Sequence, residues 1–303
     1  MSEYKKILIG LNLSEMDHTT IAYAAMVFSL AGGERLYCMH VTRNLAIPPK
    51  IAKAYPTMLR PPDEYAADKI LASIKQSAGR KLPDMIDVDV VEGNPLDELL
   101  RRAQQKNVDM IIMGRKHNEK ETRQLPLKLT RKATCAVLIV PVNSPPKVDR
   151  MLVPVDFSPC SAYALSQGIA LAQAFGLPEI HALNVYSVPT GYHRTGKSHT
   201  EFAQIMKNNA ISDYREFIRK IEFGDIKVHM HYRLGNNPTA VIRHYAGQND
   251  IDLIITGARG RTPSAAILLG SVTERLIQTT NVPVLAVKRH NSCMTFAKAL
   301  FKI

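Results

Sequence analysis

No stretch of the sequence approaches the roughly 20 consecutive apolar residues that a helix needs to cross a bilayer. The first apolar run, residues 7–9, is also far shorter than the roughly 7–15 apolar residues of a secretory leader. These two absences argue against export and against a membrane partner. We therefore expect a cytoplasmic protein.

Patterns typical of metal and redox sites are missing as well. The four cysteines lie far apart and form no C-x-x-C pair. The ten histidines show no H-E-x-x-H motif and no other paired spacing that a metal ion would require. We therefore expect no metal site.

The charge balance is basic, with 39 Lys and Arg against 27 Asp and Glu and a formal net charge of +12. Such a balance suits nucleic acids, anionic metabolites or acidic partners. The basic residues are interspersed with acidic ones, and the sequence has no RNP-type strand, zinc-finger spacing or basic-leucine region. Specific nucleic-acid binding is therefore not expected, and a steep salt dependence of affinity would reveal it if it occurred.

What the sequence does contain is enough apolar material for two globular domains. It has 303 residues, of which 46% are hydrophobic and 22% are charged, close to the averages of globular proteins. An internal repeat supports this division, because apolar runs and turn residues recur in the same order at offsets of 143 to 147 residues. The matching segments are 6–14 with 150–158, 108–114 with 251–257, and 136–140 with 283–287. A Pro-containing linker, residues 143–149, separates the two halves.

Each half predicts strands that alternate with helices, a pattern typical of a parallel sheet with helices on both faces. In the second half we expect strands near 151–156, 179–186, 226–233, 252–257 and 283–288, and helices near 159–175, 200–221, 238–248 and 271–280. Ser158 followed by Pro159 is a helix start signal, and Ser14 is expected to cap the corresponding first-half helix, with Asp17 three residues on. The predicted fold class is α/β, with two tandem open parallel five-stranded sheets.

Two segments of the second half are expected at the carboxyl ends of strands, where open parallel sheets bind ligands. Asp156 follows the first strand, and Gly257 ends the fourth. Gly257 and Gly260 would let backbone amides approach an anion closely, and Gly270 then precedes a helix whose first N–H groups and positive dipole end face the same cleft. The hydroxyls that could reach a phosphate are those of Ser271 and Thr273, and Arg259 and Arg261 add positive charge. Taken singly, each glycine is explained by a tight turn or a helix cap, and the chain contains neither a Walker A loop nor a G-x-G-x-x-G motif.

At these residues the sequence resembles the universal stress protein family in its tandem two-domain form. The family's nucleotide motif is G-x2-G-x9-G-[ST], and Gly257, Gly260, Gly270 and Ser271 fit it in full. The resemblance covers about 1–143 and 150–289, and as a motif it is specific only in the second half.

The resemblance implies an ATP-binding, Rossmann-like domain of the adenine nucleotide alpha hydrolase-like type that acts in stress adaptation. It places adenosine near Asp156 and Val185, and the phosphates on the loop from Gly257 and the helix start at Gly270. The complete set of expected ATP-binding residues is Val155, Asp156, Val185, Gly257, Arg259, Gly260, Gly270, Ser271, Val272 and Thr273. Whether Mg²⁺ accompanies the nucleotide stays open.

The first half departs from this pattern. Asn12 stands where the second half has Asp156, and neither later glycine follows Gly114. The segment 115–135 carries seven Lys and Arg against two Glu, so it could attract an anion, but it lacks the glycine freedom that close phosphate packing requires. We therefore expect a degenerate domain over 1–143, an ATP-binding domain over 150–289, and an amphipathic C-terminal tail over 290–303.

The leading hypothesis is a regulatory protein that holds one adenine nucleotide per chain and is not an enzyme, although weak hydrolysis is compatible with it. The alternative is a slow ATP hydrolase or nucleotidyl transferase that uses the same site. No second carboxylate and no histidine is tied to the motif, as dedicated phosphoryl transfer would need. The two halves are expected to pair as an internal pseudo-dimer through their apolar last strands, and the tail either covers that seam or joins a second chain in a homodimer.

Overall fold

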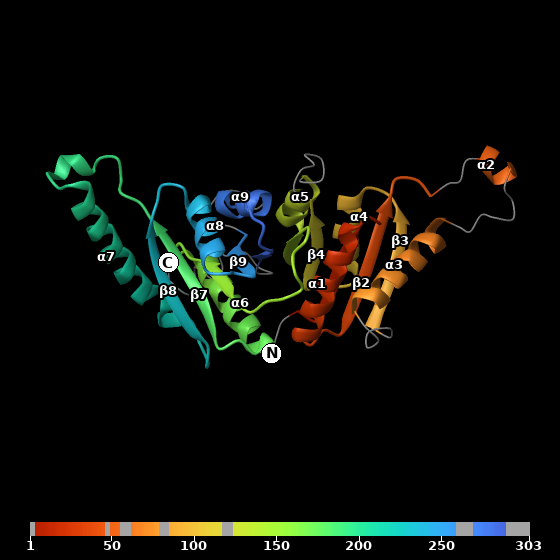
Figure 1. Cartoon of the computed structure of the whole chain (residues 1–303), viewed down its shortest axis with the longest axis horizontal. Coiled ribbons are helices and arrows are strands. Elements are labelled where there is room, and N and C mark those ends of the chain that lie inside the picture. Colours follow the sequence, from red (N-terminus) through yellow and green to blue (C-terminus); the bar gives the residue numbers. More distant parts are fainter. Residues whose placement is uncertain are drawn as a thin grey trace. The chain divides into compact units, whose positions relative to one another are not determined.

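The structure is a computed structural model, and it describes residues 4–45, 49–54, 62–78, 85–116, 124–258 and 269–288. The chain divides between Lys147 and Val148 into two compact units, named here the N-terminal and the C-terminal unit. In both units helices lie on either side of a sheet (Figure 1).

The described strands of the N-terminal unit form a parallel sheet in the order β3-β2-β1-β4-β5. The strands are β1 (Lys6–Leu11), β2 (Arg35–Thr42), β3 (Ile86–Glu92), β4 (Met110–Arg115) and β5 (Ala136–Pro141). The helices are α1 (Met16–Leu30), α2 (Pro49–Ala54), α3 (Pro62–Ala78), α4 (Pro95–Gln105) and α5 (Gln124–Lys132).

The described strands of the C-terminal unit repeat this plan in the order β10-β9-β6-β7-β8, again all parallel. The strands are β6 (Met151–Pro154), β7 (Glu179–Tyr186), β8 (Lys227–Leu234), β9 (Leu253–Gly257) and β10 (Val284–Val287). The helices are α6 (Pro159–Phe175), α7 (His199–Phe217), α8 (Pro238–Gln248) and α9 (Ser271–Thr279), with short 3-10 turns at Tyr192–Thr195 and Ile218–Lys220.

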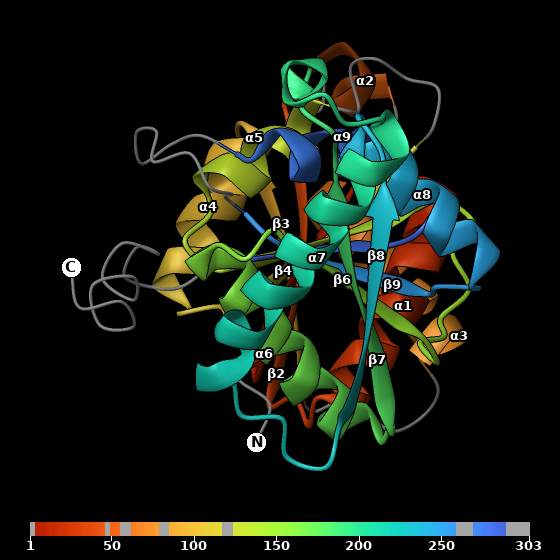
Figure 2. The same cartoon turned by 90° about the vertical axis from the view of Figure 1, so that its left-hand side faces the viewer.

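Side-chain contacts show which helices cover which face of the C-terminal sheet. Gly168 of α6 packs against Ile180 of β7, whereas Tyr245 of α8 is bonded to His181, the next residue along that strand. Because successive strand residues point to opposite faces, α6 and α8 lie on opposite faces. The helix α9 packs against α8, and α7 lies on the other side of the edge strand β8 from α8, as Figure 2 shows.

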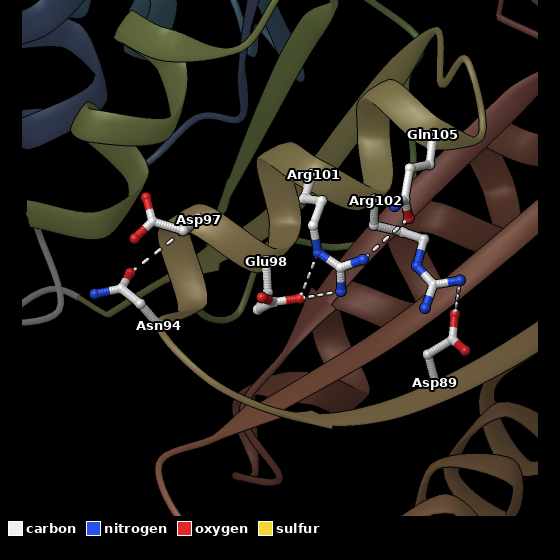
Figure 3. Close-up of polar contacts among 7 residues, drawn as sticks. All are labelled: Asp89, Asn94, Asp97, Glu98, Arg101, Arg102 and Gln105. Atoms are coloured by element: carbon white, nitrogen blue, oxygen red, sulfur yellow. Dashed lines mark hydrogen bonds and ion pairs between the residues drawn. The ribbon is translucent and has the colours of Figure 1, made fainter.

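In the N-terminal unit, α4 is fixed at both of its ends. Its N-cap residue, Asn94, accepts hydrogen bonds from the N–H groups of Leu96 and Asp97, which otherwise have no acceptor within the helix. Near its other end, Arg102 forms an ion pair of 3.0 Å with Asp89 of β3, so that the helix is tied to the sheet (Figure 3).

The predicted α/β architecture, with five parallel strands in each half, is confirmed. Every element predicted in the second half is present, with boundaries within about two residues of the prediction except the end of 200–221, where α7 gives way to a 3-10 turn at Ile218. The Ser158 cap is also confirmed, because its hydroxyl accepts from the Ser161 N–H. The pairing of the two halves stays a prediction, and the tail 290–303 lies outside the described residues. Among the helices that the structure describes, none combines the length and the apolar character that crossing a bilayer requires.

The prediction of a helix cap at Ser14 is wrong. The helix α1 begins at Met16 after Glu15, without a side-chain cap. The carboxylate of Asp17 instead accepts from the backbone N–H groups of Asn12 and Leu13. Asp17 therefore stabilises the turn between β1 and α1 and does not take part in a cap of the helix.

Candidate functional site

The order of strands in the C-terminal unit reverses between β6 and β9. The chain runs from β6 outward through β7 to β8, and then returns to β9 and β10 on the other side. The connections that leave β6 and β9 therefore diverge to opposite faces and open a crevice at the carboxyl ends of these strands.

A cavity of about 360 Å³ lies at this reversal, within the range of small-molecule sites. Its described lining residues come from the ends of β6, β7 and β9 and from α6, α8 and α9. They are Pro154, Val155, Asp156, Ser161, Leu183, Asn184, Val185, Pro238, Ile242, Thr256, Gly257, Gly270, Ser271, Val272 and Thr273.

Every predicted ATP-binding residue that the structure describes lines this cavity, which brings together residues from Val155 to Thr273. Arg259 and Gly260, also predicted, lie outside the described residues. The sequence analysis missed several lining residues, some polar and some apolar. They are Ser161, Asn184 and Thr256 among the polar ones, and Pro154, Leu183, Pro238 and Ile242 among the apolar ones. Asn184 is the one with a visible signal, because the repeat aligns it with His40.

Asp156 sits where the chain turns sharply from β6 into α6. One carboxylate oxygen accepts from the Ser158 hydroxyl at 2.6 Å and from its backbone N–H at 3.1 Å. The residue between them, Phe157, has φ 64°, a left-handed conformation that is rare for a large side chain. Its ring packs against Phe217 and Tyr214 of α7, which stabilises the turn. The turn therefore holds the carboxylate at the cavity.

The floor of the cavity is closed by bonds between the ends of β6 and β7. The buried amide of Asn184 donates to the Val155 carbonyl at 2.9 Å, and the Val155 N–H donates to the Leu183 carbonyl at the same distance. The wall beside this floor is apolar, with Leu183 and Ile242 buried. Such a surface suits a flat, weakly polar ring better than a charged group.

The opposite side of the cavity is the N-terminus of α9. Gly270 is the N-cap residue and carries no capping side chain, and its N–H donates to the Ala258 carbonyl at 2.8 Å. The first N–H groups of a helix lack acceptors within the helix, and the helix dipole places partial positive charge there. Ser271 follows with an exposed side chain. This end of the cavity therefore favours an anion.

Thr273 also lines the cavity, but its hydroxyl bonds inside the protein. The side chain is 2% exposed, and its Oγ1 donates to the Gly257 carbonyl at 2.9 Å and lies 3.0 Å from the Thr256 Oγ1. Because the single hydroxyl hydrogen is used on Gly257, Thr273 fixes α9 to the end of β9. It does not have the free donor that the sequence analysis assigned to it.

In the N-terminal unit a cavity of about 20 Å³ lies at the end of β1, where α1 and α3 meet. Part of the geometry of the C-terminal site recurs at this strand end, because His40 Nδ1 contacts the Leu11 carbonyl at 3.1 Å, as Asn184 contacts Val155. At the offset of 144 residues, Asp17 stands in the place of Ser161, which lines the C-terminal cavity. Burial raises the pKa of the Asp17 carboxyl, although the N–H groups it accepts from oppose that shift.

Side chains of α1 pack closely on β4 near its carboxyl end. An added Cβ at Gly114, the next to last residue of β4, would lie 2.5 Å from the Thr20 hydroxyl and 2.9 Å from the Met16 methyl. The last residue of the strand, Arg115, is 1% exposed and stands in the place of Ala258 at the offset of 143. The N-terminal unit therefore has a large buried side chain where the C-terminal unit has a small one.

The described lining of the C-terminal cavity offers few ionisable groups. Asp156 is the only ionisable side chain among its described lining residues. In the parts of the chain that the structure describes, no group of three or more His, Cys, Asp or Glu side chains could hold a metal ion. An arrangement of a nucleophile with a general base is likewise not present among the described lining residues.

Comparison with known proteins places both units in one family. The model of the universal stress protein family matches residues 3–141 and 147–288. Universal stress protein MJ0577 from Methanocaldococcus jannaschii is 31% identical over 47% of this chain and 96% of its own length. Universal stress protein E from Photorhabdus laumondii is 22% identical and matches 95% of this chain and 96% of its own length.

Among solved structures, a universal stress protein from Archaeoglobus fulgidus matches with a TM-score of 0.60 at 20% identity. The match covers 95% of this chain and 98% of that one. At this identity the likeness concerns the fold.

Proposed function

Since the chain belongs to the universal stress protein family, with the family domain in tandem, we propose that its C-terminal unit binds one adenine nucleotide, ATP in particular, as a regulatory ligand in the cytoplasm. The observation that carries the proposal is the cavity of about 360 Å³, with a carboxylate at one side, a helix N-terminus at the other and an apolar wall between them. A nucleotide offers ribose hydroxyls, phosphates and a base to three such surfaces.

The proposed pose follows from these surfaces. The phosphates lie on the N-terminus of α9 at Gly270 and Ser271, with Arg259 and Gly260 completing the phosphate contacts. The ribose hydroxyls donate to the Asp156 carboxylate, and the base lies along the wall that Leu183 and Val185 form. A magnesium ion would be held by the phosphates and water, because among its described residues the cavity offers one carboxylate.

The experiment has two parts. One sample of the purified protein is denatured, and mass spectrometry identifies any nucleotide that it releases. The native full chain is then titrated with ATP by calorimetry. We expect one nucleotide per chain, because the glycine motif is complete in the second half and neither later glycine follows Gly114 in the first. Two equivalents, or none, would refute the proposal.

A pair of glycine variants makes the test specific to this cavity. Gly270 has φ −63° and ψ 138°, which any residue can adopt, so Gly270→Val should fold while its side chain blocks the phosphate end. We expect it to abolish ATP binding. The matched control is Gly191→Val, because an added Cβ at Gly191 meets nothing within 4 Å, and this variant should bind as the wild type does.

The enzymatic alternative makes a different prediction in the same assay. A dedicated hydrolase or nucleotidyl transferase would release phosphate or pyrophosphate over many turnovers, whereas a regulatory site returns ATP intact. We favour the regulatory site because Asp156 is the only ionisable side chain among the described lining residues.

A further inference from the structure

Three histidines gather on the face of the C-terminal sheet that α8 covers. His181 of β7 pairs in register with His229 of β8, and His231 lies two residues further along the same strand. The His181 ring lies 6.0 Å from that of His229 and 5.4 Å from that of His231, measured between centroids. All three side chains are partly buried. We call them the histidine cluster.

The histidine cluster contacts the helix that forms part of the nucleotide cavity. Tyr245 of α8 is 2% exposed, its hydroxyl is hydrogen-bonded to His181 Nδ1 at 2.8 Å, and its ring lies 5.1 Å from that of His231. One turn earlier on the same helix, Ile242 lines the cavity. The pairing of β7 with β8 gives a second connection between the cluster and the cavity, because His231 pairs with Leu183, which also lines the cavity. The histidine cluster and the cavity therefore share one helix and one strand.

The charges around the histidine cluster are mostly positive. The Glu179 carboxylate of β7 accepts from His229 Nε2 at 2.8 Å and is the single carboxylate in contact with the cluster among the described residues. Arg233 of β8 lies over the Tyr245 ring at 5.6 Å, Arg150 precedes β6, and Lys227 begins β8. A second and a third proton on the rings would therefore meet no further opposite charge among the described residues.

Two of the rings are held in the neutral form at neutral pH. Burial lowers the pKa of His231, and the neighbouring His181 and Arg233 lower it further. Burial and the neighbouring His229 lower the pKa of His181, against the weaker effect of Glu179. Within the described part of the chain, the buried His231 Nε2 has no hydrogen-bond partner, so a proton there would add a buried charge without an acceptor.

We propose that protonation of the histidine cluster in mild acid loosens α8 from the sheet and thereby lowers the affinity of the adjoining cavity for adenine nucleotide. The second part, on affinity, rests on the proposed function. Protonated rings 5.4 to 6.0 Å apart repel each other, and release of α8 lets water reach them. Because α8 supplies Ile242 and Pro238 to the cavity wall, its release removes part of the surface against which the ligand packs.

The size of the effect follows from the ordinary pKa of histidine. In the loosened state each ring titrates near about 6.5, so lowering the pH from 7.5 to 5.5 favours that state by about tenfold for each ring that stays neutral while α8 is packed. His181 and His231 together then give at most about a hundredfold.

The first measurement is native-state hydrogen exchange on the full chain at pH 7.5 and 5.5, corrected for the intrinsic pH dependence of exchange. We expect the protection of α8 amides to fall, by at most about a hundredfold, with a smaller change in α6 on the opposite face. The second measurement is the affinity for ATP over the same interval, which should fall by the factor by which the packed fraction of α8 decreases.

Two sets of variants test the assignment. His181→Asn keeps a polar group near the Nδ1 position for Tyr245, and His231→Phe keeps a ring where the buried nitrogen has no partner. The double variant, or His231→Phe alone if the double variant unfolds, should lose most of the pH response of α8. His244→Gln, on an exposed residue of the same helix, should retain it.

The result that overturns the inference is α8 protection that is unchanged at pH 5.5, or that falls equally in the wild type and in the His231→Phe and double variants. A pH response of α8 without any ATP binding at pH 7.5 would support the loosening of α8 by protonation and refute the proposed function instead. An ATP affinity that stays constant to pH 5.5 while the packed fraction of α8 falls would refute the coupling alone.

Discussion

The bond that holds α9 to the end of β9 makes a quantitative prediction. Replacing Thr273 by Val keeps the shape of the side chain but removes the hydroxyl that donates to the Gly257 carbonyl and contacts the Thr256 hydroxyl. Both partners lie in a buried region, where loss of a hydrogen-bond partner costs about 1–3 kcal/mol. We therefore expect Thr273→Val to lower the free energy of unfolding of the C-terminal unit by about 1–3 kcal/mol.

The assay is hydrogen exchange of the slowest amides of β9, because a chain of two units need not unfold in one transition. Thr273→Ser keeps the hydroxyl and should lose less stability. Thr279→Val is the matched control on the same helix, since that exposed hydroxyl bonds only to the Arg275 carbonyl one turn back. It should change stability by no more than about 0.5 kcal/mol. If Thr273→Val proves no more destabilising than Thr279→Val, the buried bond does not hold α9 in place.

Three further variants test Asp156 in the candidate site and Asp17 in the N-terminal unit. Asp156→Ala should weaken ATP binding by about 1.5–3 kcal/mol, the usual contribution of a charged hydrogen bond, and calorimetry would show an unchanged affinity if the ribose does not reach this carboxylate. Asp17→Asn should raise the denaturant midpoint of the N-terminal unit at pH 7 but not at pH 3. The raised pKa of Asp17 means that its ionisation costs stability as pH rises through that pKa, and below its unfolded pKa both states are protonated. Asp17→Ala should instead lower the free energy of unfolding at pH 7 by about 1–3 kcal/mol, and with it the midpoint, because the N–H groups of Asn12 and Leu13 lose their acceptor. An unchanged midpoint would contradict this role.

The fold was predictable because its signals are local. Short apolar runs between turn residues give buried parallel strands, and Ser158 with Pro159 starts a helix through bonds that span three residues. The repeat then fixed the number of elements, because each segment of one half supported the identification of its partner. The prediction of a cap at Ser14 was wrong because the Asp17 carboxylate can accept N–H groups either at the helix end or in the preceding turn. Sequence spacing does not distinguish these two arrangements.

The candidate site was predictable in its glycines and Asp156 but not in its wall. Leu183 and Ile242 look like any buried apolar residue in the sequence, and only the packing of α8 on β7 brings them to the same cavity. The hydroxyl of Thr273 shows the opposite case. Its place two residues after Ser271 indicates a phosphate donor. Two residues turn the helix by about 200°, however, and place the Thr273 hydroxyl towards β9, where the Gly257 carbonyl accepts its hydrogen.

The two halves share one architecture but differ in side-chain volume near the strand reversal. The strand order and the carbonyl contact at the end of the first strand are the same in both units, through Asn184 in one and His40 in the other. At the offset of 144 residues the N-terminal unit has Asp17 where the C-terminal unit has Ser161, which lines the cavity. Asp17 is buried, and its carboxylate is an internal acceptor for the turn at Asn12. One position can therefore serve the turn in one unit and the cavity wall in the other without a change of fold.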